Sequence, residues 1–285
     1  MPELPRTPVG DRVDNIVDWL TDNVNWLFDF ISEVLQFFID ALEDLLTWPD
    51  PLVLIVIFAL FAWWIRSAMF GLFTLLAMAL VESMRLWEAS MSSLSLVLVA
   101  SLVAIVIGVP LGITTSRSTV VSTIVRPMLD FMQTMPAFVY LVPAIVFFGI
   151  GQVPGVVATV VFSMPPAVRF TELGIRQVDE EVVEAGHAFG SAPSQILTKI
   201  QLPLALPTIM AGINQVIMLA LSMVVISGMV GAGGVGAVVF RGITRLDVGL
   251  GVEGGLAVVI LAIFLDRITA AIGDRASQFR DRSAA

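Results

Sequence analysis

The sequence lacks cysteine altogether and has a single histidine, His187. Without cysteine the chain forms no disulfide and offers no thiol for chemistry. One imidazole does not make the ligand set of a zinc site or a proton relay, so we expect no metal site and interpret His187 as a solvated loop residue. Charged residues make up only 14% of the chain, whereas soluble domains carry about a quarter. With a hydrophobic fraction of 57%, this scarcity predicts a membrane protein.

Lysine is almost missing as well, since Lys199 is the only one and lies between Thr198 and Ile200. The phosphate-binding loop of nucleotide hydrolases needs a lysine between glycine and serine or threonine. We therefore expect no enzyme activity and no cofactor on this chain, and energy from another polypeptide or an ion gradient. The glycines of residues 231–236 match the spacing of a dinucleotide-binding motif. That motif must follow a β-strand, whereas these glycines follow an apolar run that is predicted to span the membrane, so no dinucleotide site is expected. They are expected to bend the chain, or to let it re-enter, at the end of a span.

Residues 1–50 are predicted to form a separate acidic and amphipathic segment. Acidic residues recur between Asp14 and Asp44 at spacings of four and seven, which places them on one stripe of a helix, opposite an apolar stripe. Tryptophan favours the headgroup level of a membrane, and three occur here: Trp19, Trp26 and Trp48. Two interpretations remain open, a helix lying flat on the membrane and a helix packed on the protein's own flank. No cleavable signal peptide is expected at this end.

Residues 51–275 are predicted to form the transmembrane domain of an all-α, polytopic membrane protein. A perpendicular span needs roughly 20 apolar residues, and about seven transmembrane helices are expected: 52–65, 68–84, 91–115, 127–150, 153–168, 203–230 and 252–272. Arg66 is assigned to a surface turn, because an arginine at the bilayer centre costs about 2.5–3.5 kcal/mol. One crossing over residues 52–84 is the alternative.

The basic residues predict the orientation of the chain. If the polar loop at 169–202 is cytoplasmic, ten of the 15 basic residues lie inside and five outside, the bias that cytoplasmic loops show. We therefore expect the N-terminus outside and a cytoplasmic tail at 276–285. A single crossing over 52–84 would place the N-terminus inside.

The polar island between the apolar blocks predicts a helix, a sharp turn and a second helix. Acidic residues at 179–181 suit the start of a helix. Gly190 suits the left-handed residue that ends it. Ser191 is the expected N-cap of the second helix, and Pro203 leads back into an apolar run.

The spacing of this island resembles the EAA loop of bacterial ABC-importer permeases, with Gly186 in place of the usual third alanine. In that family the loop is cytoplasmic, and its short helix docks into a groove on the ATPase subunit. The resemblance implies that coupling to the ATPase is carried by the matching positions: Glu184, Ala185, Gly186, Gly190, Ile200, Leu202 and Pro203. An ordinary amphipathic loop between spans is the structural alternative.

Residues 133–143 and 207–223, with Arg241 and Asp247, resemble glycine betaine/proline betaine permeases of osmoprotectant ABC importers. The resemblance covers about residues 50–275. It implies a type I importer permease fold in the bacterial cytoplasmic membrane, and the permease subunit of an ATP-driven importer of quaternary-ammonium osmoprotectants. The implied partners are a second permease copy in a homodimer, ATPase subunits that hold ATP and Mg, and a separate extracytoplasmic betaine-binding protein; no nucleic acid is involved.

Residues that could line the pathway come from the same stretches. Aromatic faces attract a quaternary ammonium, and proline or polar side chains within a span are expected to face the protein interior. The candidates are Gln133, Pro136, Phe138, Tyr140, Asn214, Met218 and Ser222. For each of them, apolar packing or lipid contact is the alternative.

Other functions are weighed against this one. An importer of another small solute, such as choline, carnitine or an amino acid, would share the same features. An ion-coupled secondary transporter would need intramembrane carboxylates or histidines, and the predicted span cores contain almost none. A membrane scaffold that transports nothing would have no need of an ATPase-docking loop.

Overall fold

The computed structural model describes the backbone of residues 9–283 and the side chains of residues 10–274. Within this range every regular element is a helix, which confirms the all-α prediction. In chain order the elements are α1 (Val9–Thr47), α2 (Pro51–Ile65), α3 (Ala68–Ser83), α4 (Trp87–Arg117), α5 (Thr119–Thr134), α6 (Ala137–Phe148), α7 (Gln152–Arg176), α8 (Glu180–Ala188), α9 (Pro193–Ile196), the π-helical segment η1 (Leu197–Gln201), α10 (Leu202–Ser227), the short 3-10 helix η2 (Gly228–Val230), α11 (Gly234–Arg245) and α12 (Val248–Ser283).

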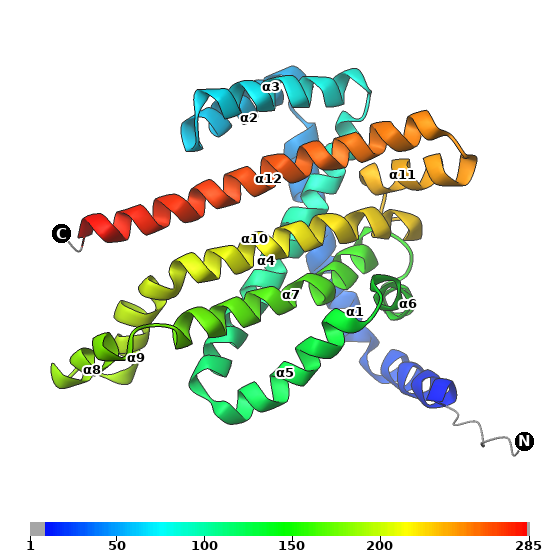
Figure 1. The fold of residues 1–285 in the computed structure, drawn as a ribbon. Helices are drawn as coiled ribbons and strands as arrows, with labels where there is room; N and C mark the ends of the chain where they lie inside the picture. The colour runs from blue at the N-terminus through cyan, green and yellow to red at the C-terminus, as the bar shows by residue number, and fades with distance from the viewer. Residues whose placement is uncertain (1–8, 284–285) are drawn as a thin grey trace, which may run out of the picture.

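Helices α4, α7 and α10 form the centre of the molecule, and α12 packs along α10 (Figure 1). Glycines let these helices approach closely: a Cβ added at Gly112 of α4 would lie 2.6 Å from the Cβ of Thr171. One added at Gly212 of α10 would lie 2.6 Å from the Cβ of Phe170. Lipid chains are as apolar as leucine, so helices in a bilayer associate through such close packing and not through a hydrophobic driving force. Helix α7 is therefore held on two sides by small residues of its neighbours.

The number of membrane spans differs from the predicted number. Judged by length and composition, four helical stretches within the described residues can cross a membrane: Trp87–Arg117, Gln152–Arg176, Pro193–Val230 and Val248–Asp274. These correspond to four of the seven predicted spans. Two bent helix pairs raise the number to six if each is one span. The protein is thus multi-pass, with fewer full-length spans than the apolar runs suggested.

The span predicted over 127–150 is broken in the middle. Helices α5 and α6 meet at an angle of 100°, so α6 is seen end-on in Figure 1. Pro136 has no N–H to donate, and Met135 before it is extended (φ −69°, ψ 136°) because a residue preceding proline disfavours the helical region. The hydroxyl of Tyr140 donates to the carbonyl of Met132 at 2.7 Å and fixes the two helices across the break.

Residues 51–83 form a helical hairpin, α2 and α3, packed side by side (Figure 1). The chain reverses at Arg66 and Ser67, and the Ser67 hydroxyl accepts from the Phe70 N–H at 3.3 Å as the N-cap of α3. The turn predicted at Arg66 is confirmed. The alternative of one crossing over residues 52–84 would need a single continuous helix, and the chain instead reverses between Ile65 and Ala68. With 15 and 16 residues, each helix is shorter than the roughly 20 residues of a perpendicular span.

The second half of the amphipathic helix α1 packs on the protein's own flank. Ile39 is fully buried against the core, and the amide of Gln152 at the start of α7 donates to Glu43 at 2.9 Å. The first half leaves apolar side chains exposed, including Trp19 and Trp26. Flank packing is therefore confirmed for the second half, and the first half keeps an unpartnered apolar stripe.

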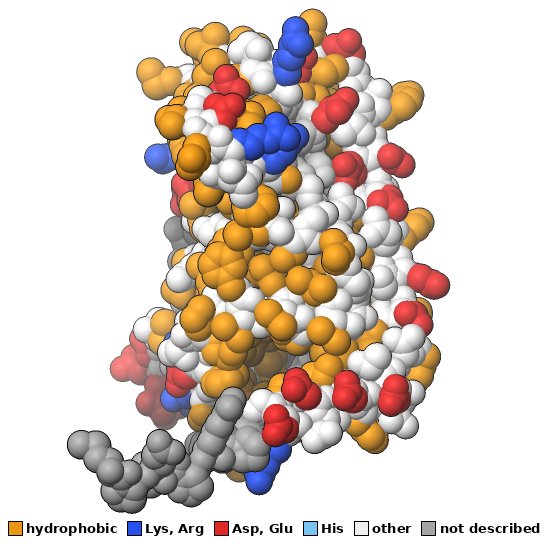
Figure 2. Space-filling model, turned by 90° about the vertical axis from the view of Figure 1, so that its right-hand side faces the viewer, with side chains coloured by type: hydrophobic (Ala, Val, Ile, Leu, Met, Phe, Trp, Pro, Cys, Tyr) orange, Lys and Arg blue, Asp and Glu red, His pale blue; other side chains and the backbone are white. Residues whose placement is uncertain are grey.

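The molecule has two distinct ends. Helices α8 and α9 and the end of α12 lie at one of them, and α11 lies at the other (Figure 1). Seen from the α11 end, apolar side chains cover the centre of the face and acidic side chains gather along its right-hand edge (Figure 2). The bend predicted for residues 231–236 is confirmed, because Gly231, Gly233 and Gly234 have positive φ and separate the end of α10 and η2 from the start of α11. The tail predicted at 276–285 continues α12 as far as Ser283, and its side chains lie outside the described residues.

Candidate coupling loop

The loop predicted to be the functional site begins with the short helix α8. The carboxylate of Asp179 accepts from the N–H of Glu181 at 2.9 Å and caps the first turn. Glu180 and Glu181 lie in that turn, where the partial positive charge of the helix start favours carboxylates. The predicted helix start is thus confirmed, with Asp179 as its cap.

Gly190 ends α8 as predicted. Its φ is +77°, a left-handed conformation that glycine adopts without a side-chain penalty. Its N–H donates to the His187 carbonyl at 2.9 Å, and the N–H of Ser191 donates to the Gly186 carbonyl at 3.1 Å. These two bonds make the Schellman motif, which satisfies carbonyls that the helix end would otherwise leave unpaired. The turn is therefore fixed by backbone bonds and not by packing.

The second helix starts one residue later than predicted. Ser191 is not its N-cap; Ala192 holds that position, and its N–H donates to the side-chain oxygen of Gln195 at 3.0 Å. The expectation for Ser191 was wrong because α9 begins at Pro193, so that Ser191 lies one residue before the cap position and its N–H belongs to the α8 turn. Pro193 then opens α9, where its missing N–H costs nothing.

Helix α9 continues without a break into the membrane helix α10. Between them, η1 has the wide π geometry, and the N–H of Leu202 donates five residues back to Leu197. Pro203 has no N–H, and its ring would clash with the carbonyl of Lys199 in a regular α-helix, so the wider turn removes the conflict. Leu202 packs against Ile175 and Ile209, whereas Pro203 is exposed.

Gly186 and Ile200 are brought into contact by this fold. Gly186 is buried, and a Cβ added there would lie 2.8 Å from Cδ1 of Ile200 and 3.5 Å from Cγ1 of Ile196. The missing methyl group thus lets α8 lie close on the isoleucines of the second helix. The third residue of the motif, Gly186, thus lies against its isoleucine, Ile200.

The remaining loop residues face outward. Glu184 and Ala185 are exposed, and Val182, Ala185 and Phe189 follow each other at helical spacing, which places them on one face of α8. The Phe189 ring is 90% exposed and Val182 is 42% exposed. Acidic side chains flank this apolar stripe at Glu181 and Glu184. The structure therefore presents a small apolar surface with an acidic border, held by the Gly190 turn.

The loop is tied to the membrane helices by a hydrogen bond from the end of α4. The guanidinium of Arg117 donates to the carbonyl of Pro193 at 3.2 Å. This bond fixes the start of the second helix relative to α4, so the loop is attached to the membrane helices at this point as well.

An ion cluster lies beside this connection. The side chain of Glu172 on α7 is only 5% exposed, and its Oε1 atom accepts hydrogen bonds from Ser122 at 2.8 Å and Arg126 at 2.9 Å and forms an ion pair with Arg176 at 3.0 Å. Arg176 also donates to the carbonyl of Thr115 at 2.9 Å. Asp130 and Arg169 form a neighbouring pair. Helices α4, α5 and α7 are thus joined next to the loop.

This cluster was not predicted from the sequence, because the arginines were used only to predict which side of the membrane each loop lies on. The spacing of four between Glu172 and Arg176 was the one local signal, since it places both on the same face of a helix. The partners on α5 lie about 50 positions away in sequence, and no local pattern joins them.

The pathway candidates from the first stretch lie around the break between α5 and α6. Gln133, Pro136 and Phe138 are exposed. Tyr140 is partly buried and is used by its bond to Met132. Tyr140 packs with the apolar cluster that contains Met223 of α10. The stretch 133–143 therefore lies beside the end of the stretch 207–223.

The candidates on α10 separate into two groups. Asn214 faces α12, where its amide donates to Asp266 at 2.9 Å and its oxygen accepts from Thr269 at 2.6 Å. Met218 and Ser222 are exposed one turn apart. The bonds of Asn214 indicate a role in joining α10 to α12, and the exposed face of the other two is available to a ligand or to a neighbouring chain.

Comparison with known proteins shows similarity to transport permeases. Residues 104–278 match the family "Binding-protein-dependent transport system inner membrane component". The chain is 52% identical to the glycine betaine transport system permease protein OpuAB of Bacillus subtilis, over 94% of this chain and 95% of that protein. It is 48% identical to the glycine betaine/carnitine transport permease protein GbuB of Listeria monocytogenes, over 97% and 99%. It is 48% identical to the glycine betaine/proline betaine transport system permease protein ProW of Escherichia coli, over 93% of this chain and 75% of that protein.

A solved structure of the MetNI methionine ABC transporter, in an inward-facing conformation, has a chain with a similar fold. The TM-score is 0.60 at 23% identity, over 65% of this chain and 92% of that chain. The similarity extends to the fold, which is that of type I importer permeases.

The Gly190 turn leads to a testable prediction. Replacement of Gly190 by valine forces a branched side chain into a left-handed conformation and is expected to cost about 1–2 kcal/mol locally. The amides of Gly190 and Ser191 should then lose protection in hydrogen exchange. Ala188→Val is the matched control, because it puts the same side chain on an exposed residue of α8 that has helical backbone angles. Unchanged protection in Gly190→Val would show that the turn does not depend on glycine.

Proposed function

Because the chain belongs to the family of binding-protein-dependent transport system inner membrane components, we propose that it is the permease subunit of an ATP-driven importer of glycine betaine and related quaternary-ammonium osmoprotectants. The observation that carries the proposal is the 52% identity to a glycine betaine permease over nearly the whole length of both chains. As a permease it is a transport component and not an enzyme. It forms the membrane pathway, and the energy comes from a separate ATPase.

The closeness of the relatives favours betaine over other solutes. Three permeases named for glycine betaine match at 48–52% identity over at least 93% of this chain. A choline permease matches at 33% over 50% of it. The methionine transporter shares the fold alone, so amino-acid transport has no comparable support. Carnitine stays a second candidate substrate, because the Listeria relative is named for glycine betaine and carnitine.

The test is uptake of labelled glycine betaine by vesicles that contain the permease, its ATPase and its binding protein. Uptake should need ATP and the ATPase, and should be competed by carnitine more strongly than by choline. Vesicles with the permease alone should accumulate nothing under a proton or sodium gradient. Gradient-driven uptake by the permease alone would make it a secondary transporter.

The ATPase is proposed to bind the loop from α8 to the start of α10. The apolar stripe of Val182, Ala185 and Phe189 has the size of a small docking surface, and its acidic border suits basic groups on a partner. The turn at Gly190 and the contact of Gly186 with Ile200 hold α8 at a fixed orientation. ATP and Mg would be held by the partner.

Phe189 is expected to provide most of the docking energy, because buried aromatic anchors dominate interfaces. Phe189→Ala should weaken association with the ATPase by about tenfold or more, equivalent to at least roughly 1.4 kcal/mol. The control is His187→Ala, which changes a neighbouring exposed side chain of the same helix. Association is measured by co-purification and titration in detergent. Equal affinities for both variants would exclude Phe189 as the anchor.

The proposed orientation places the loop and the end of α12 in the cytoplasm, and α11 and the N-terminus outside. Basic side chains at the loop end, including Arg117, Arg126, Arg176 and Lys199, support it by the bias of cytoplasmic segments. The binding protein would then approach the α11 end, where Ile243, Leu246 and Val248 are exposed. A second permease copy is proposed to face the exposed side of α10 at Met218 and Ser222, with the pathway between the copies.

The orientation can be read by cysteine labelling, since the chain has no native cysteine. Ser194 and Asp247 are both exposed and lie at opposite ends. A membrane-impermeant thiol reagent added to intact cells should label Asp247→Cys and leave Ser194→Cys unmodified until the membrane is opened. The reverse pattern would invert the orientation.

A further inference from the structure

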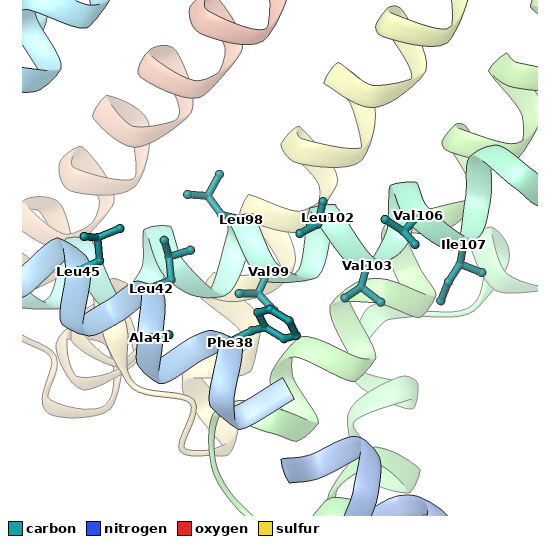
Figure 3. A pocket seen from close by; sticks show the side chains of 10 residues that line it. All are labelled: Phe38, Ala41, Leu42, Leu45, Leu98, Val99, Leu102, Val103, Val106 and Ile107. Carbon is teal, nitrogen blue, oxygen red and sulfur yellow. The ribbon is translucent and has the colours of Figure 1, made fainter. Parts of the chain in front are cut away.

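Two cavities between α5 and α7 have charged linings, whereas the furrow between α1 and α4 is lined by apolar side chains alone (Figure 3). The first cavity is lined by Leu173 and five charged residues: Arg126, Asp130, Arg169, Glu172 and Arg176. The second shares Arg126, Asp130 and Arg176, and its other lining residues are Thr119, Ser122, Thr123 and Pro127. Because they have three lining residues in common, the two cavities adjoin each other at Arg126.

Helix α5 separates this polar space from an apolar surface. Its polar lining residues recur at spacings of three and four, which places them on one face of a helix: Thr119, Thr123, Arg126 and Asp130. Another face is apolar, and its side chains Val120, Ile124 and Phe131 are exposed. Ionisable groups of a membrane protein face the interior of the bundle or a water-filled cavity. The polar face of α5 is therefore turned to a space that a charged ligand can enter.

The space lies at the end of the spans next to the coupling loop. Arg176 is the last residue of α7, and Thr119 is the first residue of α5. The hydrocarbon layer of a bilayer ends where its spans end. At this level a solute from water and the headgroup of a phospholipid are both within reach.

The guanidinium groups in the lining keep most of their hydrogen-bonding capacity. Each guanidinium has five N–H donors. Among the described residues, Arg126 donates only to Glu172, and Arg169 only to Asp130. Their side chains are 58% and 40% exposed, so the other N–H groups are open to a ligand. A planar guanidinium matches two oxygens of a carboxylate or a phosphate, which it binds through two parallel hydrogen bonds.

The charges of the lining favour an anion. Three arginines face two carboxylates, so the first cavity has a net charge of three minus two, or +1. The carboxylate of Glu172 is buried and already engaged by its partners on α5 and α7. Only Asp130, which is 65% exposed, offers negative charge to a ligand. A cation would meet three guanidinium groups, whereas an anion would meet one carboxylate that has room to turn into water.

We propose that the space around Arg126 is a binding site for an oxyanion, held by the guanidinium groups of Arg126 and Arg169. Two sources share this chemistry: the carboxylate of a zwitterionic solute such as a betaine, and the phosphate of a phospholipid headgroup. The first source rests on the proposed function, and the second does not. In either case the ligand competes with Asp130 for Arg169, while the bonds of Glu172 stay in place.

Arginine modification by phenylglyoxal tests the proposal on the full-length permease, purified in detergent and stripped of lipid. Peptide mass spectrometry gives the modification rate of each arginine. An oxyanion at about ten times its dissociation constant leaves about one site in eleven free, so Arg126 and Arg169 should react about tenfold more slowly. Arg241 is the control residue, because it is exposed on α11 at the opposite end of the molecule. Its rate should not change.

Four additions separate the two sources. Glycine betaine is compared with choline, which has the same quaternary ammonium group and no carboxylate. Phosphatidylglycerol is compared with diacylglycerol, which has the same acyl chains and no phosphate. Protection by glycine betaine alone assigns the site to the solute, protection by phosphatidylglycerol alone assigns it to the headgroup, and protection by both shows that it accepts either oxyanion. The phospholipid comparison stays valid even if the permease carries another solute.

Two variants change the exposed pair of Asp130 and Arg169 and leave the bonds of Glu172 untouched. Asp130→Asn removes the competitor of the ligand and should lower the protecting concentration by up to about fivefold, the effect of an exposed ion pair. Arg169→Gln removes one of the two binding groups and should raise that concentration, as measured at Arg126. A purely structural cluster predicts no tighter binding in Asp130→Asn.

Three results would overturn the proposal. One is an equal modification rate at Arg126 with and without each oxyanion. Another is equal protection by choline and glycine betaine and by diacylglycerol and phosphatidylglycerol, because the oxyanion would then play no part. The third is a lack of reaction at Arg126 and Arg169 before any oxyanion is added, because a protein chain would then cover the space.

Discussion

The ion cluster around the buried carboxylate of Glu172 is the interaction on which the end of the molecule with the coupling loop depends. Removing a charge from water is costly, and it is tolerated only when partners satisfy it. Here Ser122, Arg126 and Arg176 provide them, and Arg176 extends the network to the Thr115 carbonyl. Loss of one partner costs less than the about 3–5 kcal/mol of a fully buried pair, because the side chains of Arg126 and Arg176 are 58% and 40% exposed and water screens their charges. Helices α4, α5 and α7 are therefore held together by the ion pairs and hydrogen bonds of Glu172 and Arg176.

The parts of the structure that depend on neighbours in sequence could be predicted. Gly190 could be recognised as a helix terminator because a left-handed residue is a local requirement. The glycines at 231–236 could be recognised as a bend for the same reason, and the acidic start of α8 follows from the helix dipole. The long apolar helices were equally visible, since composition alone places them in lipid. The roles of the predicted coupling residues stay a prediction, supported by their placement in one compact loop.

The parts that depend on contacts over long distances could not be predicted. The Glu172 cluster joins positions about 50 residues apart. Asn214 was a candidate for the pathway, yet its bonds to Asp266 and Thr269 direct it toward α12. The break at Pro136 was concealed in an apolar run whose length suited a single span. In each case the sequence shows the residue type, and only the packing shows which partner satisfies it.

The coupling loop is the end of a rod that reaches the other end of the molecule. From Pro193 to Val230 the helical stretch runs for 38 residues, about 57 Å at 1.5 Å per residue, and it ends at the glycine-rich bend before α11. Arg117 fixes the start of this rod to α4. A displacement of α8 by a partner would therefore be carried along α10 to the α11 end, and would load the Arg117 bond and the Glu172 cluster on the way.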